Sequence, residues 1–261
     1  MILKPPKGAM LNRGHPLARG LVGCWLMNEG GGNIVNDLSG NGNRGVFGTG
    51  LNSPSWVAGK FGNAIATGAT KYITAFPLKG PWNVNQFTVV AHAKLMIDPT
   101  TFVCVLVSIV TTGGTDEILR LVSTTPTGTW FVSNDFGLSL TGPVVVTNQW
   151  YQIAIVFDYP RNATLYVDGV KQVSDITLAG SVGSPNLFSI SGYAWAQSAG
   201  WQGEVSDVKV YNRALTATEV QQLYMTPFRM FEREPIELWT ATMGGGAAPS
   251  NMIYDYRVRV G

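Results

Sequence analysis

Histidine, cysteine and charged side chains are scarce in this chain of 261 residues. Charged residues make up 13% of it, and it has two His and two Cys. The net charge of +2 forms no basic stretch of the kind that neutralises phosphates, so the sequence predicts no nucleic-acid-binding surface. Cys24 and Cys104 stand in apolar surroundings without the CxxC spacing of metal and redox sites, which predicts two buried free thiols.

Long apolar runs are also missing. The longest, FVCVLVSIV at 102–110, is about half the ~20 residues that a membrane-spanning helix needs, and its β-branched residues favour a buried strand. The N-terminal stretch is interrupted by Lys, Pro and Arg and has no continuous apolar segment of the secretory type. We therefore expect neither membrane insertion nor export by a signal peptide.

Glycine, proline and tryptophan are abundant, with 31, 14 and 8 copies. This composition suits short strands joined by tight turns better than long helices, and the length suits one all-β domain with tails. Residues Asp168 and Gly169 predict a two-residue hairpin turn, and 216–224 predict one short helix capped by Thr216 or Thr218. Five segments alternate with the period of a half-buried strand: 87–97, 150–159, 163–173, 187–195 and 203–215.

Five sequence stretches follow one another between Gly20 and Tyr224: GLVGCWLMNEGGG, DLSGNGNRG, GKFGNAI, NQWYQIAIVFDYPRNATLYVDGVKQV and GEVSDVKVYNRALTATEVQQLY. Together they resemble the successive signatures of concanavalin A-like, laminin-G-like jelly-roll domains. The resemblance implies an all-β fold of two antiparallel sheets packed face to face, closed where the first and last strands meet. We expect an N-terminal arm at 1–19, the sandwich at 20–226 and a C-terminal arm at 227–261.

A calcium site is one implication of this resemblance. Structural calcium in such domains often lies where the early Asp-rich turn meets the late strand, and calcium takes six to eight oxygen ligands. The matching carboxylates are those of Glu29, Asp37 and Asp207. Amide oxygens would complete the set, from Asn28, Asn41 and Asn43. No cofactor is expected to be required, and the structural calcium ion is an optional one.

A metal-free turn is the alternative for the same residues. The late strand has Ser206 where these domains usually carry a second acidic residue, so one charged ligand is missing. Short polar side chains can instead bond the backbone of the turn, as Asp37, Ser39 and Asn41 would do. Glycines can supply positive φ angles without an ion, at Gly40, Gly42 and Gly45. The sequence leaves both alternatives open.

Catalysis is not expected. Glycosidases need two carboxylates aimed at one glycosidic bond, and on this fold an E-x-D-x-x-E strand usually supplies them. The chain has no such array. Strand alternation would send Asp116 and Glu117 to opposite faces, and likewise Glu204 and Asp207, which are three residues apart. His92 lacks an evident nucleophile partner and is interpreted as a structural or surface histidine.

An aromatic loop is the candidate carbohydrate-binding element. The stretch GYAWAQSAGWQG at 192–203 places Tyr193, Trp195 and Trp201 in a Gly-rich loop. Exposed rings of this kind stack on sugar faces, while amide and carboxylate groups hold the hydroxyls. The alternative is that one or two of these rings close the core of the sandwich, because large aromatics are mostly buried.

The tails suggest assembly. The last residues alternate apolar and charged side chains, with the apolar face formed by Tyr254, Tyr256, Val258 and Val260. This pattern predicts a strand that adds to a neighbouring chain across the GGGAAPS hinge; the alternative is that it folds back on its own domain.

An N-terminal arm containing HPLARGLVGCW, a jelly roll and an aromatic, Arg-containing tail together resemble structural proteins of tailed bacteriophages, such as head decorations and tail or fibre components. We therefore interpret the chain as a non-enzymatic virion protein, assembled in the host cytoplasm with identical chains or other virion subunits. Its loops would touch host-surface glycans. A free carbohydrate-binding module of a microbe is the alternative, and an atypical glycosidase is the third.

Overall fold

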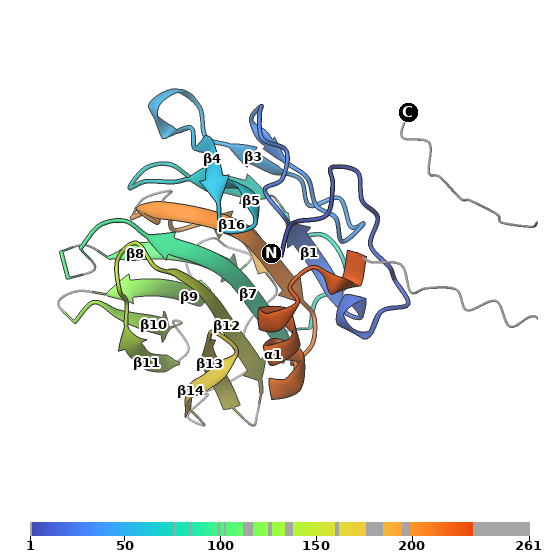
Figure 1. Cartoon of the computed structure of the whole chain (residues 1–261). Helices are drawn as coiled ribbons and strands as arrows, with labels where there is room; N and C mark the ends of the chain where they lie inside the picture. The colour runs from blue at the N-terminus through green and yellow to red at the C-terminus, as the bar shows by residue number, and fades with distance from the viewer. Residues whose placement is uncertain are drawn as a thin grey trace, which may run out of the picture.

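The computed structural model describes residues 2–231 apart from a set of short gaps. These gaps are 76, 84, 99, 102, 112–116, 125–126, 134–137, 160–161, 176–184 and 195–198. The expected assembly strand lies outside the described residues, with Tyr254, Tyr256, Val258 and Val260. Figure 1 shows the strands of one sheet following one another across the molecule, with the N-terminal segment and the single described α-helix lying in front of them.

The first sheet has eight antiparallel strands. Seven lie in the order β14 (Val170–Asp175), β13 (Asn162–Val167), β12 (Trp150–Asp158), β7 (Gln86–Leu95), β16 (Gly203–Tyr211), β5 (Gly62–Ala66) and β4 (Ser55–Gly59). The eighth strand, β1 (Leu21–Trp25), pairs with one half of β16, from Val208 to Tyr211. The other half of β16 pairs with β5 at Glu204 and Val205. The first and last strands of the sandwich therefore meet, as the resemblance implied.

The second sheet also has eight described strands, and every pair is antiparallel. Their order is β11 (Ser139–Val144), β10 (Thr129–Ser133), β9 (Glu117–Thr124), β8 (Cys104–Thr111), β15 (Pro185–Ile190), β6 (Ile73–Ala75), β3 (Gly45–Phe47) and β2 (Ile34–Val35). Three short 3-10 turns join the elements: η1 (Pro16–Ala18), η2 (Gly50–Asn52) and η3 (Arg229–Phe231).

The main core fills the space between the two sheets. Alternate residues of β7 point into it, as the period of two predicts: Phe87, Val89, Ala91, Ala93 and Leu95. Aromatic rings from different strands stack inside, with Trp25 4.9 Å from Phe188 and Phe87 4.8 Å from Phe157 between centroids. The all-β, two-sheet sandwich predicted from the sequence is confirmed.

A second apolar cluster covers the outer face of the first sheet. Its sheet residues include Val90, Ala154 and Tyr211, which project away from the main core. Leu17 of the N-terminal segment and Val220 of the helix pack onto them. Strands at the centre of this sheet are therefore buried on both faces, and all nine residues of β16 are buried.

Residues 2–19 lie against the domain. The backbone N–H of Lys4 donates to the carbonyl of Phe61 at 3.1 Å, and that of Asn12 donates to the carbonyl of Met230 at 2.8 Å. Leu17 is buried under the second cluster. The described part of the expected N-terminal arm thus packs on its own chain. The first residues of the expected C-terminal arm do the same, because Met230 and Phe231 are buried there.

The predicted helix is present as α1 (Ala217–Met225), and its N-cap is Thr216. The Thr216 hydroxyl accepts the N–H of Glu219, and the Glu219 carboxylate accepts the N–H of Thr216, which forms a capping box. Arg213 holds the same carboxylate at 2.7 Å. Among the residues that the structure describes, no helix has the length and apolar character needed to cross a membrane.

Candidate functional site: the polar row and the loop end

A bulge in β16 places two acidic residues on the same face of the first sheet. Glu204 lies opposite Lys94 of β7, and Asp207 lies opposite His92, two positions along that strand. Ser206 is the extra residue between the two pairings. The expectation that Glu204 and Asp207 point to opposite faces is therefore wrong, because one unpaired residue reverses the alternation.

These side chains form a buried row of charges. His92 Nδ1 lies 3.0 Å from Asp207 Oδ2, and the Lys209 ammonium is ion-paired with the same carboxylate. Lys94 Nζ lies 3.0 Å from Glu204 Oε2 at the edge of the row. His92, Asp207 and Lys209 are 0% exposed, so this part of the row is shielded from solvent, whereas the side chains of Lys94 and Glu204 are 19% and 11% exposed. His92 is thus a buried structural histidine.

The electrostatics of the row keep Asp207 ionised. Burial raises the pKa of its carboxyl, but the attraction of His92 and Lys209 and the hydrogen bond to His92 outweigh burial, so its pKa lies well below the ordinary value. Burial lowers the pKa of His92, against the opposing attraction of Asp207. A buried carboxylate with a lowered pKa is unsuited to protonate a sugar leaving group, which needs a carboxyl that holds its proton near neutral pH.

The three carboxylates expected to bind calcium do not converge. Among the described residues, no group of three or more His, Cys, Asp and Glu side chains is placed to hold a metal ion. Glu29 Oε1 accepts the N–H of Asn36 at 2.7 Å, while Asp207 is held by His92 and Lys209 in the polar row. The set of Glu29, Asp37 and Asp207 is therefore divided among separate hydrogen-bonding groups.

Asp37 organises the early turn through its own hydrogen bonds. Its Oδ1 accepts the backbone N–H of Cys24 at 2.9 Å and of Ser39 at 2.8 Å, and its Oδ2 accepts the Ser39 hydroxyl and the N–H of Asn43. The amides bind carbonyls nearby: Asn28 donates to Pro5, Asn41 to Val22, and Asn43 to Val22 and Lys79. Two of the three expected glycines have positive φ, Gly40 and Gly42, whereas Gly45 lies in β3 with an ordinary φ.

The aromatic candidates for sugar stacking separate in the structure. Trp201 is 0% exposed, its ring lies 5.5 Å from that of Trp130 in a stacked geometry, and its Nε1 donates to the carbonyl of Lys94. Its assignment as a sugar-stacking ring is therefore wrong, because no ligand in solution can reach it. Tyr193 is half-buried in the loop, and Trp195 lies outside the described residues.

Several loops gather at one end of the sandwich, where β7 ends and β12 and β16 begin. The backbone N–H of Met96 donates to Gln202, and that of Asn148 donates to Leu95, so the loops after β7, before β12 and before β16 lie together. The N–H of Val145 donates to the carbonyl of Gly128, which adds the turn before β10. We call this set of loops the loop end.

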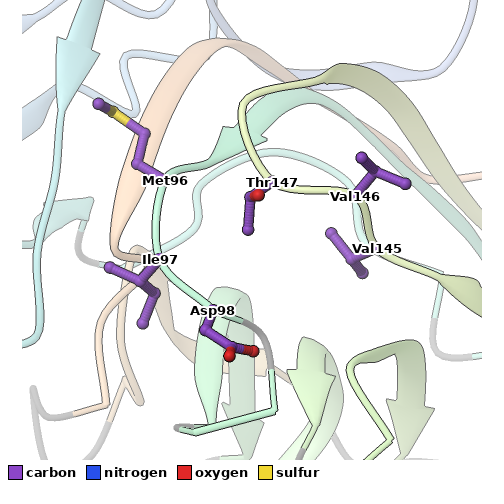
Figure 2. Close-up of a pocket in the computed structure, with 6 residues that line it drawn as sticks. All are labelled: Met96, Ile97, Asp98, Val145, Val146 and Thr147. Carbon is purple, nitrogen blue, oxygen red and sulfur yellow. The ribbon is translucent and has the colours of Figure 1, made fainter.

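A depression of about 380 Å³ opens at the loop end, lined by Met96, Ile97, Asp98, Val145, Val146 and Thr147. Figure 2 shows the two stretches that face each other across it. Met96 is 50% and Val146 is 54% exposed, so the walls present apolar surface to solvent. No local pattern in the sequence marks this site, because its two walls are separated by nearly fifty residues.

One wall of the depression is hydrogen-bonded to an aromatic residue of the first sheet. The Tyr151 hydroxyl accepts the backbone N–H of Val146 at 3.1 Å, and the Tyr151 ring packs edge-on against Trp130 at 5.6 Å. The ring of Trp201 stacks on that of Trp130. Trp201, which was expected to bind sugar, is thus connected to Val146 only indirectly, through Trp130 and Tyr151.

Asp98 supplies a charged group at the rim. Its Oδ1 accepts both the N–H and the hydroxyl of Thr100, at 2.8 and 2.7 Å, and these hydrogen bonds lower the pKa of Asp98 below its ordinary value. Its Oδ2 has no partner among the described residues. Together with the hydroxyl of Thr147, the depression combines apolar walls with a few hydrogen-bonding groups, which is the composition of many small-ligand sites.

A smaller hollow of about 240 Å³ lies between the N-terminal segment and the end of α1. It is lined by His15, Pro16, Leu17, Gln222, Thr226 and Arg229. The Nδ1 atom of His15 accepts the N–H of Leu17 at 3.1 Å, so this imidazole caps the turn η1. The hollow follows from the packing of the N-terminal segment on the helix.

Comparisons with known proteins agree with this architecture. A family model described as the concanavalin A-like lectin/glucanases superfamily matches residues 67–221. No curated protein sequence matches the chain. Domain 4 of AbnA, an extracellular arabinanase of Geobacillus stearothermophilus solved in complex with arabinotriose, is similar with a TM-score of 0.62 and 18% identity, over 78% of this chain and 98% of that domain.

Two further structures are similar at the level of fold. Trypanosoma rangeli sialidase, solved with the inhibitor DANA, has a TM-score of 0.61 and 16% identity, over 80% of this chain and 33% of the sialidase. The binding domain of Paraclostridial Mosquitocidal Protein 1 has a TM-score of 0.61 and 17% identity, over 80% of this chain and 52% of that one. This chain thus corresponds to about a third of the sialidase.

Proposed function

Because the chain belongs to the concanavalin A-like lectin/glucanases superfamily, we propose that it binds carbohydrate at the loop end without catalysing a reaction. The observation that carries the proposal is the depression between 96–98 and 145–147, which joins exposed apolar walls to an open carboxylate oxygen. The arabinotriose complex of the AbnA domain supports it as an example of a sugar bound to a protein of this fold.

The chemistry of the depression suits a sugar ring. The exposed methyl groups of Val146 and the thioether of Met96 would cover the C–H face of the ring. Asp98 would accept hydrogen bonds from sugar hydroxyls at Oδ2, because an exposed aspartate is ionised at neutral pH and its Oδ1 is already used by Thr100. Thr147 would donate or accept one more hydrogen bond. Tyr193 lies on an adjoining loop of the same end and would extend the contact surface.

The absence of catalysis is part of the proposal. Within its described lining, the depression has one carboxylate, Asp98, whereas glycoside hydrolysis ordinarily uses two. The carboxylates of Glu204 and Asp207 lie outside this lining and are paired with the ammonium groups of Lys94 and Lys209. A carbohydrate-binding module that leaves its ligand intact fits this arrangement better than an atypical glycosidase. Incubation with the ligands found below, followed by chromatography of the products, should return them uncleaved.

Glycan-array binding by the full chain tests the site, followed by affinity measurements on two matched variants. Val146 and Val170 are both exposed valines, at 54% and 60%, and Val170 lies on β14, at the edge of the first sheet and outside the lining of the depression. We expect Val146→Asp to weaken binding by ~10-fold or more and Val170→Asp to leave it unchanged. Equal affinities for the two variants would place the site elsewhere, and an array without signal would remove the proposal.

The wider setting that we propose is a virion in which this domain is a structural subunit that displays its loop end outward. The support is the sequence pattern of the N-terminal stretch, the sandwich and the aromatic tail. Light scattering on the full chain should find an oligomer, and a chain truncated from Gly244 onward should lose it while the sandwich keeps its melting temperature. A monomeric full chain would contradict the assembly role while leaving the carbohydrate proposal intact.

A further inference from the structure

The side chain of Lys4 enters a gap in the first sheet. On one side of β16, the pairing with β5 ends at Val205 and the pairing with β1 begins at Val208, so neither strand pairs with Ser206 there. The Lys4 ammonium occupies this opening and donates to three main-chain carbonyls, those of Met27, Ser206 and Asn63. The nitrogen lies 3.4 Å from the Met27 oxygen and 2.8 Å from the Ser206 oxygen.

Each carbonyl comes from a different part of the sheet. Met27 follows the end of β1 and has a φ of 46°, in the left-handed region that non-glycine residues seldom adopt. Asn63 lies in β5, and Ser206 is the bulged residue of β16. Three carbonyl oxygens therefore converge on one point because two strand ends and one bulge meet there.

The charges around this point balance one monovalent cation. Asp207 and Glu29 attract Lys4, and Lys209 repels it. Two carboxylates against one ammonium leave a single negative charge, which Lys4 neutralises. Glu29 Oε2 is also buried without a hydrogen-bond partner. Burial lowers the pKa of Lys4 to about 8, against the attraction of Asp207, so the side chain is mostly protonated at pH 7.

We propose that the carbonyls of Met27, Asn63 and Ser206 form a binding site for a monovalent cation, and that the ammonium of Lys4 is its built-in occupant. Carbonyl oxygens can replace the hydration shell of a monovalent cation, and ammonium and potassium ions have similar demands for such oxygens. Calcium fits less well, because it takes more oxygens and usually several free carboxylates, whereas Asp207 is already engaged by His92 and Lys209.

Through Lys4, the N-terminal segment occupies this cation site of its own domain. Two hydrogen bonds hold the segment beside the site: the N–H of Lys4 donates to Phe61 at 3.1 Å, and the Asn28 amide donates to the carbonyl of Pro5 at 3.1 Å. A free monovalent cation and the Lys4 side chain would therefore compete for the same three oxygens. Removal of the side chain should leave a vacancy that a small cation can fill.

Chemical rescue tests the inference. We expect Lys4→Ala to lower the melting temperature at pH 7 by roughly 4–8 °C, because three carbonyls, two of them on the buried residues Met27 and Ser206, lose a charged donor. Ammonium or potassium chloride should restore at least about half of this loss, whereas tetramethylammonium chloride at equal ionic strength should not, because the ion is too large for the carbonyls. Lys7→Ala is the matched control, since Lys7 is an exposed lysine of the same segment.

A second variant separates the site from general salt effects. Lys4→Met removes the charge but keeps a stem of similar length, so it should be destabilised without responding to ammonium. An equal response of all variants to the three salts would overturn the proposal, as would a Lys4→Ala variant with unchanged stability. Rescue by calcium in place of monovalent ions would overturn the assignment of the three carbonyls to a monovalent cation. If Lys4→Ala fails to purify in folded form, its refolding yield in ammonium against tetramethylammonium gives the same comparison.

Discussion

The imidazole of His92 and the carboxylate of Asp207 face each other across β7 and β16, with Nδ1 3.0 Å from Oδ2 and both side chains fully buried. Lys209 contacts the same carboxylate from two positions along β16. Buried charges are costly unless they are paired, so each member of this group depends on the others. The group occurs where the bulge at Ser206 turns Asp207 toward β7.

Acid should destabilise the protein partly through Asp207. Its pKa in the folded state lies below its pKa in the unfolded chain, so the unfolded chain binds more protons as the pH falls. The stabilisation is therefore complete above about pH 4 and is lost as the pH falls toward the lowered pKa. Unfolding free energies at pH 3 and pH 6 should differ more for the natural chain than for Asp207→Asn. Equal pH dependence in Asp207→Asn and the natural chain would contradict this role.

Trp201 should matter for stability through its packing. Trp201→Ala removes a fully buried ring stacked on Trp130, and we expect the free energy of unfolding to fall by about 3–5 kcal/mol. Trp201→Phe should cost less because it keeps part of the ring volume. Denaturant titration gives both values. A Trp201→Phe variant with unchanged stability but weakened sugar binding would instead support an exposed, stacking ring.

Asp37 should be needed for the early turn whether or not calcium is present. Asp37→Asn replaces one acceptor oxygen by a donor NH2 group in a site where four donors already point at the carboxylate. We expect a loss of about 1–3 kcal/mol in the free energy of unfolding. The melting temperature of the natural chain should be the same in excess calcium and in EDTA. A rise in calcium that Asp37→Asn abolishes would show that the turn holds the ion after all.

The thiol of Cys24 should be unreactive in the folded protein. Burial raises the pKa of its thiol to about 12, so almost no thiolate exists at pH 8. Burial also raises the pKa of the Cys104 thiol. An aromatic disulfide reagent should therefore label neither cysteine in the native chain and both after unfolding in denaturant. Rapid labelling of Cys24 under native conditions would show that β1 opens, since Cys24 is a fully buried residue of that strand.

Much of the fold could be predicted because its signals are local. The alternation at 150–159 became β12, and Asp168 and Gly169 form the expected hairpin turn with φ angles of 51° and 75°. The capping box at Thr216 can be recognised from four consecutive residues. Each of these features depends on neighbours in the sequence, so the chain itself contains the necessary information.

The site was harder to predict because it depends on contacts between distant segments. The bulge at Ser206 is defined only by the pairing of β16 with β7, and strict alternation therefore misplaced Asp207. Trp201 stands in a Gly-rich stretch that would look the same around an exposed ring, and its burial depends on Trp130 from another hairpin. Of the aromatic residues in this stretch, Trp201 belongs to the core of the sandwich.

The pairing of β1 with β16 has a consequence for how such a unit can be combined with others. Leu21 lies opposite Tyr211, so the polypeptide enters and leaves the sandwich at points about 5 Å apart in the backbone. A module whose entrance and exit are neighbours can be grafted into a surface loop of a host protein with short connectors and little distortion of either partner. The sandwich could therefore be inserted into different host proteins, and its loop end would keep the same shape in each of them.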